Sequence, residues 1–287
     1  MRGWVPVAIL PAAVFMFVPS TWPRWGMMWA LALAIYVGCK WLTWRRTVHA
    51  GVGLTRSIGY LAFWPGLDAY AFLDPAPLPT PVRPTWREWF FAGCKLAAGL
   101  GIFFGLARWA PADRPYLTGW IGMAGLALAL HFGLFHLLSC GWRRMGVKAA
   151  PLMNWPIASV SLSEFWSRRW NTAFRDLTHR FLFRPLTSLV GGAGAVLAGF
   201  LFSGLVHDAV ISIPAGGGYG GPTLFFAIQA SGLLAERSRL GRRLGLGRGW
   251  RGWLFAGCLL VGAAPLLFHV PFVTRVIIPF MRAVGAI

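Results

Sequence analysis

Eight stretches of apolar residues follow one another along this chain, and most charged residues lie between them. A helix of about 20 apolar residues crosses the hydrocarbon core of a membrane. We therefore predict an all-α, polytopic membrane protein with about eight transmembrane helices. The apolar runs cover residues 4–18, 26–42, 90–106, 117–138, 186–213, 223–234, 253–268 and 272–287.

The composition agrees with lipid as the solvent, because 57% of the residues are hydrophobic and only 12% are charged. The 27 Lys and Arg against 8 Asp and Glu give a net charge of +19. These basic residues lie between apolar runs, where they set topology and contact anionic headgroups, and they form no basic face interleaved with aromatic residues. We expect membrane lipids as partners and no nucleic acid.

The distribution of arginine predicts the topology. Loops rich in Lys and Arg face the cytoplasm, which assigns the loops after the second, fourth and sixth runs to that side. With eight spans, both termini are cytoplasmic, and we expect a multi-pass protein of the bacterial inner membrane. The proline-rich stretch 64–86 is typical of an ordered cytoplasmic loop. We find no boundary of a second domain and treat residues 1–287 as a single membrane domain.

The segment between residues 156 and 185 has a different pattern from the apolar runs. Its apolar residues recur at steps of three and four, which is the spacing of one helical face. Ser161 and Glu164 have the S-x-x-E spacing of a capping box. Glu164 and Asp176 each precede an arginine by four residues, as in helix ion pairs with Arg168 and Arg180. This pattern predicts an amphipathic helix that is interfacial or re-entrant.

Two interpretations of this amphipathic segment fit its residues. In the first it only anchors the protein to anionic headgroups. In the second Arg168, Arg169 and Arg175 recruit a polyanionic donor such as coenzyme A. Asn171 is neither lipid-facing nor charged, so we expect it to have a polar partner within the protein.

His207 is the main candidate for chemistry. Steps of four from Ala195 pass through Gly199 and Ser203 to His207, and small residues at this spacing favour close helix packing. The histidine then faces the bundle interior next to Asp208, where ionisable groups are expensive and indicate function. A buried neutral imidazole can act as a general base. The alternative is a histidine that only links two helices, and Asp208 is free to pair with an arginine instead.

The remaining candidates for cofactor binding are weak. The cysteines form no CxxC or CxxH pair, and His131 and His136 are five residues apart, on different helix faces. We expect no metal and no resident cofactor. Lys95 is predicted to extend toward the membrane surface. The four cysteines are interpreted as packing residues: Cys39, Cys94, Cys140 and Cys258.

Several motifs together resemble the wax synthase branch of the membrane-bound O-acyltransferases. The resemblance is strongest over about residues 151–236, with WPGLD at residues 64–68 as a weaker match in the first half. Its motifs are SLSEFWSRRWN at residues 161–171, RPL at 184–186, SGLVHD at 203–208 and PAGGGYGGPT at 214–223. In that superfamily a membrane histidine and an upstream asparagine are linked to catalysis, and His207 and Asn171 match those places.

The resemblance implies transfer of an acyl group from acyl-CoA, as co-substrate, to a hydroxyl acceptor such as a long-chain alcohol. His207 then removes the hydroxyl proton, and Asn171 donates to the developing oxyanion or holds the acyl carbonyl. Arg168, Arg169, Arg175, Trp170 and Asp208 are the predicted substrate-binding residues. The acceptor stays open between a long-chain alcohol, a sterol-like or secondary-metabolite hydroxyl and a sugar. A multi-span transporter or flippase with a proton-coupled His-Asp site is the main alternative, and a membrane scaffold the other.

One geometric requirement follows from placing the two residues in one site. Residues 186–207 span about 32 Å as a continuous helix, while Asn171 precedes the start of that helix. The two side chains meet only if the amphipathic segment dips inward or the helix breaks. Gly191, Gly192 and Gly194 offer such a break.

Overall fold

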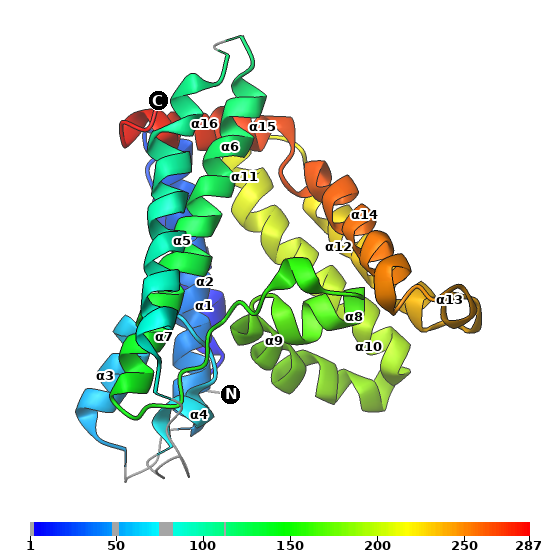
Figure 1. The fold of residues 1–287 in the computed structure, drawn as a ribbon. Coiled ribbons are helices and arrows are strands. Elements are labelled where there is room, and N and C mark those ends of the chain that lie inside the picture. The colour runs from blue at the N-terminus through cyan, green and yellow to red at the C-terminus, as the bar shows by residue number, and fades with distance from the viewer. Residues whose placement is uncertain (1–2, 48–51, 75–82, 112) are drawn as a thin grey trace. The chain divides into compact units, whose positions relative to one another are not determined.

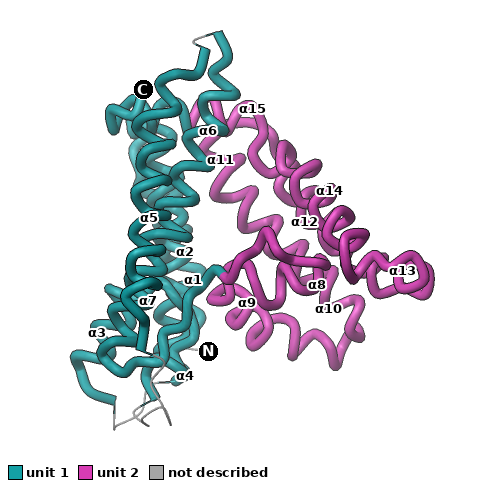
Figure 2. The backbone as a smooth tube through the Cα atoms, in the orientation of Figure 1, with its two compact units in different colours: residues 1–153, 277–287 teal, residues 154–276 magenta. Residues whose placement is uncertain are grey.

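The computed structural model describes residues 3–47, 52–74, 83–111 and 113–287 (Figure 1). Within these ranges the chain forms helices and turns and no strand, which confirms the all-α fold class. The chain divides into two compact units (Figure 2). Unit 1 contains residues 1–153 and 277–287, and unit 2 contains residues 154–276.

Unit 1 is built from long apolar helices joined by short ones. α5 and the helix formed by α6, η2 and α7 are antiparallel neighbours, and η2 is a π-helical stretch in the middle of the second. Its elements are α1 (Val5–Phe17), α2 (Arg24–Thr47), α3 (Leu54–Phe63), α4 (Ala69–Leu73), α5 (Trp86–Phe104), η1 (Leu106–Trp109), α6 (Pro115–Ala127), η2 (Leu128–Leu134), α7 (Phe135–Arg144) and α16 (Ile278–Ala283).

Unit 2 holds the segment that carries the catalytic candidates. Its long helices are α10 (Arg184–His207), α12 (Gly221–Arg237) and α14 (Gly249–Leu267), and α12 packs against both others. The shorter elements are η3 (Pro156–Ala158), α8 (Leu162–Glu164), η4 (Phe165–Arg169), α9 (Thr172–Thr178), η5 (His179–Phe183), η6 (Asp208–Ser212), α11 (Ile213–Ala215), α13 (Arg239–Leu244) and α15 (Val270–Phe272); η7 (Val273–Ile277) ends at the first residue of the unit 1 tail.

Among the described residues, five helices are long and apolar enough to cross a membrane: Arg24–Thr47, Trp86–Trp109, Pro115–Arg144, Thr172–Ala215 and Gly249–Leu267. The protein is therefore a multi-pass membrane protein, but the predicted count of eight spans is not confirmed. α1 and α12 have only 13 and 17 residues. The last apolar run is divided between α15, η7 and α16, which are too short to cross a bilayer.

Gly3 and the C-terminal residues lie near opposite ends of α2, and the cytoplasmic location of both termini stays a prediction. Gly3 packs against Leu42, near the arginine-rich end of α2: a Cβ at Gly3 would lie 3.2 Å from Cδ1 of Leu42. At the other terminus Phe280 packs against Trp25, at the start of α2, and Arg108 Nε donates to the carbonyl oxygen of Ala286 over 3.1 Å.

A buried lysine organises the WPGLD stretch of unit 1. Lys40 is 1% exposed, and its Nζ donates to the carbonyl oxygen of Gly66 over 2.5 Å. The same ammonium lies 3.6 Å from the ring centroid of Tyr60, which is a cation–π contact. Tyr36 donates its hydroxyl to the carbonyl oxygen of Trp64. This part of the predicted loop is therefore ordered, and residues 75–82 lie outside the described part of the chain.

The helix that leads to His207 breaks at a glycine, as the geometric requirement predicted. Gly191 has φ 71° and ψ 172°, inside the stretch Arg184–His207. This combination is accessible almost only to glycine. A new helical stretch therefore begins after Gly191 and ends at His207.

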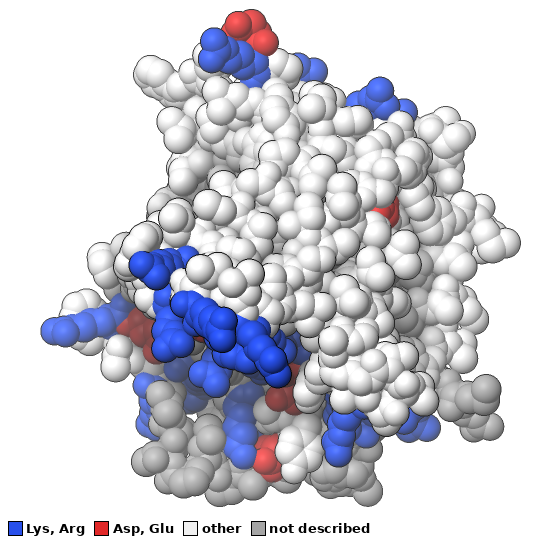
Figure 3. All heavy atoms as spheres, turned by 90° about the vertical axis from the view of Figure 1, so that its right-hand side faces the viewer, with Lys and Arg blue, Asp and Glu red and all other residues white. Residues whose placement is uncertain are grey.

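Charged residues occupy a small part of the surface. In the space-filling view Lys and Arg side chains gather in clusters, and large areas between them carry no charge (Figure 3). Exposed Trp, Phe and Leu side chains are numerous. An uncharged, apolar exterior is what contact with lipid requires.

Candidate active site

His207 is held in one tautomer by its own helix. Its Nδ1 lies 2.7 Å from the backbone carbonyl oxygen of Ser203, one turn earlier. A carbonyl oxygen can only accept, so Nδ1 carries the hydrogen of this bond. Nε2 of the neutral ring then has a lone pair, which is the state a general base needs.

The face of α10 that leads to His207 packs closely in unit 2. Ala195 and Ser203 are buried, as the small-residue spacing predicted. Next to them, a Cβ at Gly204 would lie 2.6 Å from the Cα of Thr223, at the start of α12. The two helices therefore approach each other through backbone atoms beside the histidine.

An aromatic cluster connects His207 to the amphipathic segment. The ring of Phe226 on α12 lies 4.6 Å from the imidazole and 5.8 Å from the ring of Trp166 in η4. Trp166 also meets Phe200 on α10 edge to face, at 5.4 Å. The segment that carries Asn171 thus packs into the same aromatic cluster as His207. These contacts agree with the prediction that the segment dips toward the helix bundle.

Asn171 interrupts the amphipathic segment. The predicted continuous helix is wrong here, because Trp170 is extended and Asn171 has φ 42°. The Oδ1 of Asn171 accepts the N–H of Phe174 at 3.4 Å and caps α9. Asparagine tolerates the left-handed conformation because its short side chain bonds to nearby backbone. Its expected polar partner is thus, at least in part, the backbone of α9.

The ion pairs of this segment differ from the predicted ones. Glu164 pairs with Arg169, with 2.7 Å from Nε to Oε1, and Asp176 pairs with Arg175. The predicted partners were Arg168 and Arg180. For Glu164 the cause is the π-helical turn η4, which brings residues five apart, instead of four, onto one face.

Some of the other predicted substrate-binding residues contact neighbouring parts of the segment, and one is exposed. Arg169 also donates to the carbonyl oxygens of Asn154 and Trp155, and Arg175 to that of Ser167 at 2.6 Å. Trp170 stacks on Phe165, with ring centroids 5.5 Å apart. Arg168 is exposed. Two of the three arginines are therefore engaged in holding the segment together.

Asp208 forms hydrogen bonds that fix the glycine-rich loop. Its Oδ1 accepts Ser212 Oγ at 2.8 Å and the N–H of Gly220 at 2.9 Å. Its Oδ2 accepts the N–H of Thr223 at 3.1 Å and also the Thr223 hydroxyl. The carboxylate thereby accepts hydrogen bonds from N–H groups at the start of α12, where negative charge is favourable. Its partners are hydroxyl and backbone groups of the loop and of the start of α12. The alternative left open by the sequence, an ion pair with an arginine, is not among these bonds.

His269 extends this arrangement, and no motif in the sequence pointed to this histidine. Its Nδ1 accepts the N–H of Phe272 at 3.2 Å, so Nε2 carries the hydrogen and donates to Ser212 Oγ at 3.2 Å. Burial lowers the pKa of His269, and the nearby charge of Asp208 offsets only part of this effect. The order of donors is therefore His269 to Ser212 to Asp208. Because the serine hydroxyl donates to the carboxylate, this trio lacks the arrangement of a nucleophilic triad.

Two glutamates fix the start of the amphipathic segment. Ser161 Oγ accepts the N–H of Glu164 at 2.9 Å, and Glu164 Oε2 accepts the N–H of Val160, which confirms a capping box shifted by one residue. Burial opposes ionisation, but the Val160 N–H and the Arg169 guanidinium together lower the pKa of Glu164. Glu236 of α12 is also buried and accepts the N–H of Leu162 at 2.7 Å.

A separate polar cluster lies in unit 1. Lys95 does not extend to the surface as predicted, because its Nζ lies 2.7 Å from Nδ1 of His136. His136 Nε2 lies 2.9 Å from Glu88, which also pairs with Arg143. Ligand atoms of Glu88, His136 and Cys140 lie within 4.8 Å of one another. Both imidazole nitrogens already have partners and Arg143 neutralises the carboxylate, so this trio does not fit a metal ion in its present arrangement.

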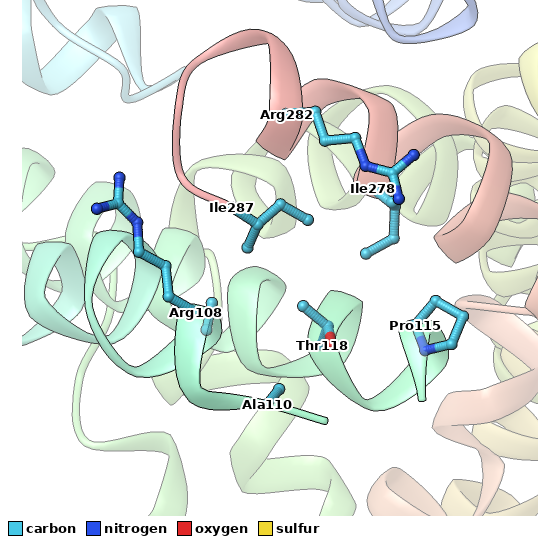
Figure 4. A pocket seen from close by; sticks show the side chains of 8 residues that line it. Arg108, Ala110, Pro115, Thr118, Ile278, Arg282 and Ile287 are labelled. Carbon is cyan, nitrogen blue, oxygen red and sulfur yellow. The ribbon is translucent and has the colours of Figure 1, made fainter. Parts of the chain in front are cut away.

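A hollow at one end of unit 1 contains no catalytic candidate. It is lined by apolar side chains such as Ile278 and Ile287, with Arg108 and Arg282 at its edge (Figure 4). Arg108 donates to backbone carbonyl oxygens of the C-terminal residues. The hollow has no base or nucleophile that would add to the site in unit 2.

Residues 149–228 match the membrane bound O-acyl transferase family. Over 72 residues the chain is 32% identical to the long-chain-alcohol O-fatty-acyltransferase of Simmondsia chinensis, covering 22% of this chain and 20% of that protein. It is 36% identical over 72 residues to the probable long-chain-alcohol O-fatty-acyltransferase 1 of Arabidopsis thaliana, covering 22% and 21% of the two chains. The aligned region spans about a fifth of the length of these curated relatives.

These matches confirm the resemblance to the wax synthase-like branch of the membrane-bound O-acyltransferases. The matched stretch contains the amphipathic segment, the broken helix α10, the glycine-rich loop and the first residues of α12. It therefore contains His207, Asn171 and Asp208.

Proposed function

We propose that this protein is a membrane-bound O-acyltransferase that moves an acyl group from acyl-CoA to the hydroxyl of a lipid-like alcohol. The family match and the names of the curated relatives support acyl transfer to an alcohol. The observation that carries the proposal is the hydrogen bond between His207 Nδ1 and Ser203 O. It leaves the lone pair of the neutral imidazole on Nε2, inside a helical unit rich in aromatic side chains.

In the proposed reaction Nε2 of His207 takes the proton of the acceptor hydroxyl while the alcohol oxygen bonds to the thioester carbonyl carbon. The carbonyl oxygen becomes an oxyanion as its double bond opens. When the double bond forms again, the carbon–sulfur bond breaks and the CoA thiolate leaves with its electron pair. The imidazolium returns the proton to the thiolate, so the products are an ester and free CoA.

Asn171 is the proposed donor to the oxyanion. The N-cap of α9 uses Oδ1 of this side chain, whereas a donor to an oxyanion would use the Nδ2 hydrogens. Donors placed in advance where negative charge develops contribute on the order of 3 kcal/mol each in well-studied enzymes. The bond from the N–H of Phe174 to Oδ1 holds the amide in place, which favours such placement of the Nδ2 hydrogens.

The donor's phosphate groups are proposed to bind at the arginine-rich amphipathic segment. Arg168 is exposed and therefore the best placed of the three arginines. Arg169 and Arg175 hold the backbone that positions it, and Trp170 supports the same turn through its stacking on Phe165. Asp208 acts by fixing the loop and α12, so its proposed role is positioning.

The test uses the purified protein in detergent, acyl-CoAs of several chain lengths and a panel of alcohols, with release of free CoA thiol as the readout. His207→Ala and His207→Gln are compared with wild type, and His179→Ala, at an exposed histidine, is the control. We expect alcohol-dependent thiol release that falls by about 100-fold or more in both His207 variants and is unchanged in the control. The best alcohol then defines the acceptor class.

An unchanged rate in folded His207→Ala protein would remove His207 from the mechanism. Thiol release that is absent from folded wild-type protein with every donor and alcohol would contradict the acyltransferase proposal. The transporter alternative, in which His207 and Asp208 form a proton-coupled site, would then be tested by proton-coupled flux in vesicles.

A further inference from the structure

Trp166 has a buried indole N–H with no hydrogen-bond partner among the described residues. A buried donor of this kind is unfavourable, because it loses its bond to water and gains none in return. Nearly all such groups in folded proteins are paired, so an unpaired one requires an explanation. The indole nitrogen can only donate, and it carries no charge. Its missing partner is therefore an acceptor atom.

The position of Trp166 indicates where that acceptor comes from. The ring contacts both Phe200 of α10 and Phe226 of α12, at 5.4 Å and 5.8 Å, and these two rings lie 6.3 Å from each other. Phe226 in turn lies 4.6 Å from the imidazole of His207. The ring of Phe226 thus contacts both the indole of Trp166 and the candidate base. Trp166 also packs against the buried core formed by residues of α8, α10, α12 and α14.

We infer that the indole N–H of Trp166 binds the carbonyl oxygen of the acyl group, as a second donor beside Asn171. This inference rests on the proposed acyl transfer. A thioester carbonyl suits the site because it is an uncharged acceptor attached to an apolar chain, and the surrounding rings offer apolar contact. The bond strengthens as the hydroxyl oxygen adds and negative charge develops on the carbonyl oxygen. Trp166 itself neither gains nor loses a proton.

Gln229 offers the competing explanation. Its Oε1 is a buried acceptor without a partner, three residues after Phe226 on α12, while its Nε2 donates to the carbonyl oxygen of Leu259 at 2.9 Å. A hydrogen bond between Trp166 and Gln229 would satisfy both atoms without any substrate. The two explanations differ in their consequences for catalysis, because only the first predicts an effect on the acyl carbonyl.

The experiment removes the N–H and keeps the ring. Trp166→Phe is made, together with a protein that carries 3-benzothienylalanine at position 166, in which sulfur replaces the indole N–H at nearly the same size. Trp250→Phe, at an exposed tryptophan of α14, is the control. The readouts are kcat and KM for thiol release, and the infrared carbonyl stretch of bound acyl-CoA labelled with carbon-13 at the carbonyl.

We expect kcat to fall by about 10- to 100-fold in both position-166 proteins, with a smaller change in KM. The carbonyl stretch of bound acyl-CoA should lie at lower frequency in wild type than in either of them, because a hydrogen bond weakens the C=O bond. The control should resemble wild type in both respects.

Unchanged kcat and carbonyl frequency in the folded benzothienylalanine protein would overturn the inference while leaving the acyltransferase proposal intact. It would also be overturned if Trp166→Phe and Gln229→Leu showed coupled losses of stability and no effect on the bound carbonyl, since the two side chains would then pair with each other. If wild type neither released thiol nor bound acyl-CoA, both proposals would fail together.

Discussion

The backbone carbonyl of Ser203 decides which nitrogen of His207 is basic. The 2.7 Å contact places the hydrogen on Nδ1 and the lone pair on Nε2. In many sites a carboxylate does this, but here Asp208, the next residue, is engaged with Ser212, Gly220 and Thr223. The helix itself therefore orients the base, while the adjacent acid orients the loop and α12. Two neighbouring ionisable residues thus have separate tasks.

The first prediction concerns the break at Gly191. Gly191→Ala should destabilise the protein by about 1–3 kcal/mol, because the new Cβ meets open space but alanine disfavours this backbone conformation. Gly192→Ala is the matched control, since its Cβ also meets open space and its φ is not positive. The control should be neutral or more stable by up to about 1 kcal/mol. Denaturant unfolding in detergent measures both, and equal stabilities would contradict the role of Gly191.

The sequence was sufficient for the fold class, and the family match covers the two residues predicted at the centre of the site. Apolar runs predicted membrane helices because their length and composition are local properties. The glycines at 191–194 predicted a break for the same reason, since a positive φ is a local preference of glycine. The S-x-x-E spacing likewise predicted the cap at Ser161.

Contacts between distant residues were not predictable in the same way. The bond from His269 to Ser212 joins residues 57 apart, and that from the N–H of Leu162 to Glu236 joins residues 74 apart. The partner of Glu164 was misassigned because α-helical spacing was assumed where the backbone forms a π-helical turn. The number of spans is not confirmed for a related reason: an apolar run forms one long helix only where its backbone remains continuous.

The second prediction concerns Ser212 and His269 as a coupled pair. Ser212→Ala and His269→Phe should each destabilise unit 2 by about 1–3 kcal/mol, because each leaves a buried polar group without its partner. The double variant should lose about 0.5–3 kcal/mol less than the sum of the two. The control combines His269→Phe with Thr178→Ala. The Thr178 hydroxyl donates to carbonyl oxygens of its own helix, so the stability losses of these two variants should add. Additivity of the Ser212 pair would contradict the hydrogen bond.

The third prediction concerns the cap that Glu236 places on the amphipathic segment. Glu236→Gln keeps an acceptor oxygen for the N–H of Leu162 and should change stability little. Glu236→Leu leaves that buried N–H unpaired and should cost about 1–3 kcal/mol. Thermal unfolding of the two variants provides the measurement. Because α8 leads into Trp166, the leucine variant should also lower thiol release more than the glutamine variant does, and the reverse order would be inconsistent with a capping role.

The last prediction concerns pH and Glu164. Hydrogen bonds from Val160 and Arg169 outweigh burial and hold its pKa in the folded protein below the usual 4.5. A carboxyl with a lowered folded-state pKa stabilises the protein above its unfolded pKa, and this contribution is lost as pH falls through the folded value. The difference in unfolding free energy between wild type and Glu164→Gln should therefore be constant above about pH 6 and should shrink below 4.5. Asp113→Asn, at an exposed carboxyl, is the control, and a difference that grew on acidification would show that the ion pair with Arg169 does not stabilise the capping turn.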